Sequence, residues 1–565
     1  MVHEAIRSLA DQLVATRFQE EPLEAALLGL PDGDVTLGDL SREAEDALLA
    51  AYSSLADAAT TLRDRLASEG SSLDEIDLVT LDHVRYSAAN RVDALGVRGV
   101  EFTISDFHNS PLSLLIAVLY QLPLDTEDRK AGHLRRLASM PAYLEGAIER
   151  HREGVAVGRV PTARGVRAAA SQIDKVLEMS DLSGLRRSFD EADDMFAGDQ
   201  DRLIESSVRP ALEEYRSFLI REARPVGRPD DKPGLCWLPD GDEAYQMLVR
   251  SYTSSARTPE DLHATGIAIT EHLREEFAEV GTRLWGISDV AEIHSRLRSD
   301  EDLRYANSEE ILASAIDIVH RAELAAPEWF GVVPSVPCAV EPVPDALADG
   351  SAPAYYFTGA LDGSRRGTYF VNATKPHERF RHSAEAIAFH EAVPGHHFQL
   401  TIAQERKGGH IVFAVFGDTA SAEGWGLYAE RLADEMGLYS SDLTRLGMLS
   451  ADAWRAARLV VDTGLHAMGW SRQEAIDWMT SHVPMSQLEI TSEVDRYVVM
   501  PAQALSYMVG RLELETRRRE SVARLGEKFS VRDFHDLVLR TGPVALPALA
   551  SAVDRWIVGG GGAPQ

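Results

Sequence analysis

The chain has 565 residues, 45% of them hydrophobic and 26% charged, and its formal net charge is −32. This composition is typical of a large globular protein of one to three domains, and the acidic balance argues against nucleic acid or an anionic membrane as the main partner. The sequence has no run of about 18 uncharged apolar residues, so it predicts no membrane span. Two cysteines, Cys236 and Cys338, are too few for a disulfide framework or a cysteine metal site. Charged residues at the N-terminus do not fit a signal peptide, so we expect a soluble, cytoplasmic protein.

The first part of the chain is predicted to be helical, because apolar residues recur at spacings of three and four. The predicted helices are 4–17, 41–67, 75–95, 111–121, 129–150, 163–179 and 200–222. A stretch rich in Pro, Gly and Asp at 224–234 then interrupts the pattern. It divides an N-terminal helical region, 1–230, from a second helical region, 231–558, or it is a long loop within one continuous domain.

The second region contains more helices and one segment with a different composition. Helices are predicted at 242–254, 259–280, 289–298, 307–325, 419–437, 443–468, 471–479, 490–520, 531–540 and 546–557. Residues 353–358 and 367–372 are predicted to be strands joined by a turn at 359–364, within a segment (331–376) rich in Pro, Gly and aromatic residues. The glycine-rich tail, 559–565, is predicted to be disordered. The expected fold is mainly α, with a small antiparallel β element that either binds an extended peptide at its edge or caps the core.

The most informative motif lies at 389–400, where His390 and Glu391 are followed by two more histidines. Helix-borne zinc hydrolases hold the metal with two imidazoles and place a carboxylate beside them, usually with H-E-x-x-H spacing. Here Pro394 occupies the i+4 position, and the next histidines are His396 and His397. On a regular helix the i+6 residue would point roughly 120° away, and the i+7 residue would lie about 10 Å along the axis.

A proline followed by a glycine changes this geometry. Pro394 should kink or end the helix, and Gly395 permits backbone conformations closed to other residues. Such a break can return His396 towards His390, so His396 is preferred to His397 as the second ligand, although the choice between them stays open. His397 could instead orient a ligand, contact substrate or lie in the core.

A catalytic zinc site needs a third protein ligand and an open position. Glu423 lies 33 positions after His390 (423 minus 390), far enough for an antiparallel return, and neighbouring glycines would let two helices approach closely. We therefore predict Glu423 as the third ligand and Glu391 as the general base. Glu430, two turns further on, is expected to support a ligand or lie on the surface.

Together these motifs resemble domain-of-unknown-function family 885, regarded as bacterial zinc metallopeptidases. The residues that carry the resemblance are 390–399, 423–428, 458–466, 469–471 and 495–504, followed by Tyr507 and Gly510. The family has Pro-Gly-Gln where this chain has Pro501-Ala-Gln503. The resemblance implies a fold similar to carboxypeptidase Taq and, more distantly, to the oligopeptidases and angiotensin-converting enzyme. It also implies one zinc ion bound by His390, His396 and Glu423.

Further residues are candidates for catalysis and substrate binding. A phenol can stabilise the oxyanion that develops during peptide hydrolysis, and Tyr507 is preferred to Tyr497 for this role. On one regular helix these two tyrosines would point about 80° apart. Arg496 could hold a substrate carboxylate through paired hydrogen bonds. His466 shares a helix face with Asp462, and it could contact substrate, or the two residues could be structural. His535 could likewise contact substrate or be structural.

The predicted function is zinc-dependent hydrolysis of peptide bonds in short peptides, of the carboxypeptidase or dipeptidase type. One alternative is a metal-dependent hydrolase of a non-peptide amide or ester. Another is a catalytically silent helical protein that binds a metal for structure; the presence of Glu391 argues against it, because a structural zinc needs no base. The sequence does not determine the oligomeric state, and a homodimer is one option.

Overall fold

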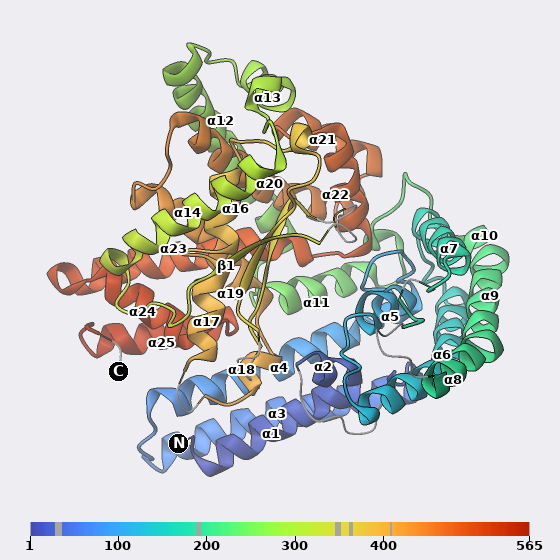
Figure 1. The fold of residues 1–565 in the computed structure, drawn as a ribbon. Coiled ribbons are helices and arrows are strands. Elements are labelled where there is room, and N and C mark those ends of the chain that lie inside the picture. The colour runs from blue at the N-terminus through green and yellow to red at the C-terminus, as the bar shows by residue number, and fades with distance from the viewer. Residues whose placement is uncertain are drawn as a thin grey trace.

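The computed structural model describes residues 2–28, 37–182, 184–187, 194–344, 348, 352–360, 365–406 and 409–563. The structure is mainly helical with one small sheet, as the sequence predicts. Figure 1 shows α1 and α3 side by side near the N-terminus, with α6–α10 gathered at one end of the molecule. Among the described residues no helix combines the length and the apolar character that crossing a bilayer requires.

The N-terminal helices begin where side chains cap their free N–H groups. Ser41, Asp74, Thr126 and Thr162 each accept a hydrogen bond from the third residue of the helix that follows. The predicted helix 200–222 is part of a longer helical rod, in which two π-helical turns, Ile204–Val208 and Leu219–Ala223, connect α8, α9 and α10. The helices are α1 (Glu4–Glu20), α2 (Pro22–Leu27), α3 (Arg42–Ser68), α4 (Glu75–Gly96), α5 (Pro111–Leu119), α6 (Glu127–Ala156), α7 (Ala163–Glu178), α8 (Asp194–Leu203), α9 (Arg209–Phe218) and α10 (Arg224–Val226).

Further helices and a sheet follow. The helices are α11 (Gly241–Thr253), α12 (Pro259–Trp285), α13 (Val290–Ser299) and α14 (Ser308–Trp329). The sheet has the order β1-β3-β2, with β1 (Ala339–Pro342) parallel to β3 (Thr368–Val371) and β2 (Ala354–Phe357) antiparallel to it.

The prediction of an antiparallel element is therefore correct for β2 and β3 but incomplete, because β1 makes the sheet mixed. No local turn links β1 to its partner, so a hairpin pattern could not reveal this parallel pairing. The predicted turn at 359–364 lies partly outside the described residues, at 361–364.

The remaining helices surround the motif. They are α16 (Ala384–Glu391), α17 (His396–Gln404), α18 (Val412–Val415), α19 (Thr419–Glu435), α20 (Asp442–His466), α21 (Arg472–His482), α22 (Gln487–Val499), α23 (Ser506–Leu525), α24 (Val531–Thr541) and α25 (Leu546–Val558). Short helical turns lie at Gly99–Glu101, Leu235–Trp237, Glu301–Leu303, Pro376–Glu378, Gln503–Leu505 and Gly526–Lys528.

One prediction in this part of the chain needs correction. The segment 490–520 is two helices, α22 and α23, because Pro501 has no N–H to continue the first helix and Ala502 has a φ of 69°. Disorder of the tail stays a prediction; in its described part, 559–563, Gly561 N–H donates to Trp556 O, and Trp556 Nε1 donates to Gly562 O. Residues 564 and 565 lie outside the described part.

Among the described residues the apolar core forms three clusters, and two of them cross the predicted boundary at 230. The largest joins Val79, Val97 and Phe102 of the N-terminal region to α11–α25 and the sheet. A second lies among α5–α9. In the third, α1, α3 and α4 pack against Val412, Val415 and Phe416 around α18.

Candidate metal centre

The motif at 389–400 forms a broken helix. α16 ends at Glu391 and α17 begins at His396, so the predicted break at Pro394 is confirmed. At Gly395 a Cβ would lie 1.9 Å from the carbonyl oxygen of His390, so no side chain fits in this tight turn. As a result the imidazole rings of His390 and His396 lie 4.8 Å apart between centres, at an angle of 86°.

Helix α19 brings a carboxylate to this histidine pair. Asp418 caps its N-terminus, and Glu423 follows one turn later. Glu423 Oε2 lies 3.4 Å from Nε2 of His390 and 3.4 Å from Nε2 of His396. In the part of the chain that the structure describes, these three residues are the one group whose possible metal-ligating atoms all lie within 4.8 Å of one another.

The spacing of these atoms fits a zinc ion. Zinc binds imidazole nitrogen and carboxylate oxygen at about 2.0–2.1 Å in tetrahedral geometry, which separates neighbouring ligand atoms by about 3.3 Å. The two measured separations of 3.4 Å agree with this value. The donor set, two imidazoles and one carboxylate, is also one that catalytic zinc sites use.

Surrounding carboxylates orient and polarise the first histidine. Glu430 is buried, and its Oε1 accepts a hydrogen bond of 2.8 Å from Nδ1 of His390, which leaves Nε2 facing Glu423. Burial alone would lower the pKa of His390, but hydrogen bonds to Glu423 and Glu430 raise it to about 9. Burial alone would raise the pKa of the Glu423 carboxyl, but the two histidines hold it well below its ordinary value. The negative charges that raise the pKa of His390 also favour a divalent cation.

The predicted base, Glu391, lies between the histidine pair and the sheet. Its Oε2 accepts a hydrogen bond of 2.9 Å from the backbone N–H of Tyr356 on β2. Because β2 is an edge strand, the edge that carries this N–H faces the end of α16. The carboxylate is therefore held beside the first histidine by the backbone of the sheet.

The two candidate tyrosines have different surroundings. The ring of Tyr507 lies 6.2 Å from that of His390 at an angle of 24°, and its pKa is raised by burial and by the negative charge of Glu423. Tyr497 is buried away from the ligands, where its hydroxyl accepts hydrogen bonds of 3.1 Å from Trp454 Nε1 and Arg458 Nε. Only Tyr507 is brought to the three-ligand cluster.

The three predicted substrate-binding residues make contacts within the protein. Arg496 donates to Glu493 at 2.9 Å and to Gln503 at 2.7 Å. His397 is buried, with Nε2 3.1 Å from Val336 O and Nδ1 3.1 Å from the Tyr356 hydroxyl. His466 lies 3.2 Å from Leu235 N and 3.0 Å from Tyr497 O.

The remaining two side chains also have internal partners. Asp462 accepts from Tyr245 at 2.6 Å and from the Ala502 N–H at 2.9 Å. His535 lies 2.9 Å from the Tyr428 hydroxyl.

Sequence reasoning did not select Arg455 and Arg458, which lie on α20 beside Tyr507. The guanidinium carbons are 5.8 and 4.4 Å from the centre of the Tyr507 ring. The sequence pattern that could have identified them is the pair of arginines at i and i+3 next to Trp454, because this spacing places both on one helix face.

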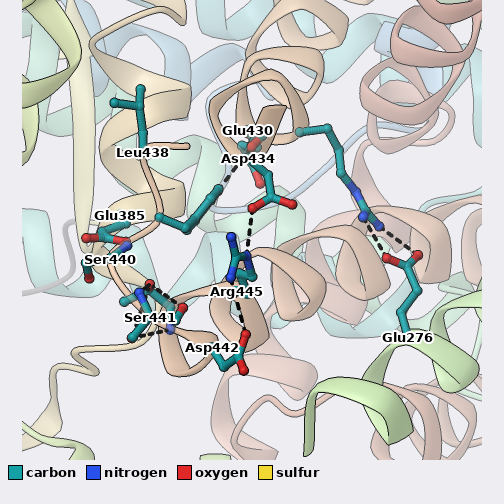
Figure 2. A network of polar contacts seen from close by, with 12 residues as sticks. Glu276, Glu385, Glu430, Asp434, Leu438, Ser440, Ser441, Asp442 and Arg445 are labelled. Carbon is teal, nitrogen blue, oxygen red and sulfur yellow. Dashed lines mark hydrogen bonds and ion pairs between the residues drawn. The ribbon is translucent and has the colours of Figure 1, made fainter. Parts of the chain in front are cut away.

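Ion pairs hold the C-terminal half of α19 in place, as Figure 2 shows around Arg445. Arg445 donates to Asp434 at 2.8 Å and to Asp442 at 3.3 Å, which joins the end of α19 to the start of α20. Glu276 of α12 accepts two hydrogen bonds from Arg431, the residue that follows Glu430. These contacts fix the helix that supplies both Glu423 and Glu430.

Comparisons with known proteins give a family and a fold. A family described as bacterial protein of unknown function (DUF885) matches residues 22–553. The structure of a candidate lipoprotein from Colwellia psychrerythraea is 24% identical, with a TM-score of 0.86 over 98% of this chain and 99% of that chain. A candidate lipoprotein of unknown function from Shewanella oneidensis is 17% identical, with a TM-score of 0.76 over 97% and 99%. None of the curated proteins gives a significant match. At these identities the two structures show a shared fold.

Proposed function

This chain belongs to the DUF885 family of bacterial proteins of unknown function, and from its site we propose that it is a zinc-dependent peptidase of short peptides. The observation that carries the proposal is the convergence of His390, His396 and Glu423. Glu391, placed beside the first ligand, supplies the base that a purely structural zinc would not need. The carboxypeptidase or dipeptidase type is the preferred form.

The roles of the side chains follow from their positions. A zinc ion bound by the three ligands would polarise the scissile carbonyl and lower the pKa of the attacking water. Glu391 accepts the proton of that water and later passes it to the leaving amine, while the Tyr356 N–H keeps one of its oxygens fixed. The ring of Tyr507 lies near His390, and the charge of Glu423 helps to keep its hydroxyl protonated. This hydroxyl donates to the carbonyl oxygen as negative charge develops there.

The nearby sheet edge supports a peptide as the substrate. β2 lies at the edge of the sheet, and Glu391 binds the Tyr356 N–H of that edge, so an extended peptide backbone that follows the rest of the edge would lie beside this carboxylate. This arrangement favours peptides over compact amides or esters. The cytoplasmic location and the homodimer remain predictions.

Replacing Glu391 by Gln tests the base. The variant should retain zinc, because no ligand is changed, and should lose about 10²- to 10⁴-fold in turnover, the usual contribution of general base catalysis. Metal content is measured by mass spectrometry, and products are identified from a defined mixture of short peptides. Glu378→Gln, an exposed acid that follows β3, is the matched control and should keep full activity.

The same experiment separates the alternatives. Unchanged turnover of Glu391→Gln would contradict the mechanism. Products from non-peptide amides or esters alone would assign the site to another substrate class. Stoichiometric zinc without hydrolysis of any substrate would indicate a structural metal.

A further inference from the structure

Two arginines on α20 contact the same aromatic ring next to the metal centre. Arg455 and Arg458 are one helical turn apart, and their guanidinium carbons lie 4.4 and 4.2 Å from the centre of the Trp454 ring. Both also contact Tyr507, at 5.8 and 4.4 Å. In a chain with a net charge of −32, this is a local concentration of positive charge.

Arg458 is buried with one nitrogen unused. Its Nε donates to the Tyr497 hydroxyl at 3.1 Å, and its Nη2 lies 3.3 Å from Glu493. Nη1 has no hydrogen-bond partner among the described residues, although only 4% of the side chain is exposed. Leaving a charged donor buried without an acceptor costs free energy, so an acceptor from a ligand at this nitrogen would be favourable.

Arg455 is also incompletely paired. Its closest carboxylate is Glu430, at 3.8 Å from Nη2, which is too long for a hydrogen bond. Its Nε has no partner among the described residues, and 12% of the side chain is exposed. By contrast, each nitrogen of the Arg496 guanidinium has a partner: Nε and Nη2 donate to Glu493, which Arg458 shares, and Nη1 donates to Gln503.

The distance from the metal ligands suits the end of a short peptide. The guanidinium carbon of Arg458 lies 4.4 Å from the Tyr507 ring centre, which is 6.2 Å from that of His390. The guanidinium is therefore within about 11 Å of this ligand, which is the length of about three extended residues. A group bound there would be one to three residues from the scissile bond.

We propose that Arg455 and Arg458 form a subsite for a carboxylate of the peptide substrate. The group is the C-terminal carboxylate of the part that is released, which makes the enzyme a carboxypeptidase or a peptidyl dipeptidase. A guanidinium matches the geometry of a carboxylate, and Tyr497 and Glu493 hold that of Arg458 rigidly. This inference rests on the proposed peptidase function.

Binding of matched peptides tests the subsite without turnover. Zinc-loaded Glu391→Gln protein is titrated by calorimetry with tetraalanine, with its C-terminal amide, and with a trialanyl-glutamate amide that carries only a side-chain carboxylate. We expect the free acid to bind about 10- to 100-fold more tightly than the amide, because a charge-assisted hydrogen bond is lost. The wild-type enzyme should show the same ratio in kcat/KM.

Substitutions of the two arginines then test whether they cause the preference for the free acid. Arg458→Met and Arg455→Met should reduce the preference for the acid towards 1 while zinc content stays constant, and Arg458→Lys should recover part of it. Arg283→Met, which removes a half-exposed arginine from α12, is the control and should keep the full preference.

Each outcome has a distinct meaning. Equal binding of acid and amide, with both hydrolysed, overturns the subsite and leaves the peptidase function standing. Equal binding of the glutamate amide and the acid assigns the carboxylate to a side chain. Failure of the wild type to bind or hydrolyse any of these peptides overturns the peptidase function, and the subsite with it.

Discussion

Glycines determine how closely α19 approaches His390, the first predicted ligand. A Cβ at Gly426 would lie 2.7 Å from Cε1 and 2.8 Å from Nε2 of His390, closer than real contacts allow. At Gly424, a Cβ would lie 2.4 Å from the backbone of Gly510 on α23. The prediction that glycines near Glu423 permit a close approach is therefore confirmed, and it follows from residue size alone.

Gly426→Ala should weaken metal binding without removing a ligand. The added methyl group displaces the His390 imidazole, so we expect zinc affinity to fall about 10- to 100-fold, as when the support of a ligand is lost. Competition with a zinc chelator measures the affinity. Gly198→Ala on α8, where nothing lies within 4 Å of the added Cβ, is the control. Unchanged affinity in Gly426→Ala would contradict the close contact.

At the scale of elements, the break between α22 and α23 gives Tyr497 and Tyr507 different surroundings. Pro501 ends the first helix, and Asp462 of α20 accepts the N–H of Ala502 in the turn. The second helix can therefore turn Tyr507 towards the metal ligands while Tyr497 stays in the core. On the single helix predicted from periodicity the two residues would lie about 15 Å apart along the axis, whereas both rings lie within 5.9 Å of the Arg458 guanidinium carbon.

Asp462 makes this turn sensitive to pH. Burial raises the pKa of its carboxyl to about 7, whereas the unfolded value is about 3.9. The native state therefore binds this proton more tightly than the unfolded state does. The stability that this difference provides falls as pH rises from about 4 to about 7. Asp462→Asn keeps an acceptor oxygen but cannot ionise. We expect the variant to gain about 1 kcal/mol or more relative to wild type across this window.

Urea unfolding of the metal-free proteins between pH 4 and pH 8 measures this difference. A stability difference between Asp462→Asn and wild type that does not change with pH would show that the carboxyl does not titrate in this range.

At the scale of the whole molecule, the N- and C-terminal regions share their cores. The C-terminal helix α25 packs on α4, where Arg555 donates to Glu75 at 3.0 and 2.7 Å. α1 likewise packs on α18. We therefore expect residues 231–558, produced alone, to expose apolar surface and lack a cooperative unfolding transition.

Calorimetry and near-UV circular dichroism of that fragment check this expectation. Adding residues 1–230 in trans should restore part of the native signal. An isolated fragment that unfolds as cooperatively as the full chain and binds one zinc ion would establish 231–558 as an independent domain.

The sequence by itself determined the helical class, most helix positions and the candidate ligands, because apolar periodicity, caps and a His-Glu motif are local signals. The broken helix at Pro394 was local too. Only the tertiary structure decided which groups meet: the parallel pairing of β1, the support of His390 by Glu430, and the two arginines against Tyr507. These contacts join segments far apart in the chain, and their geometry depends on how helices pack around glycines, which no local pattern encodes.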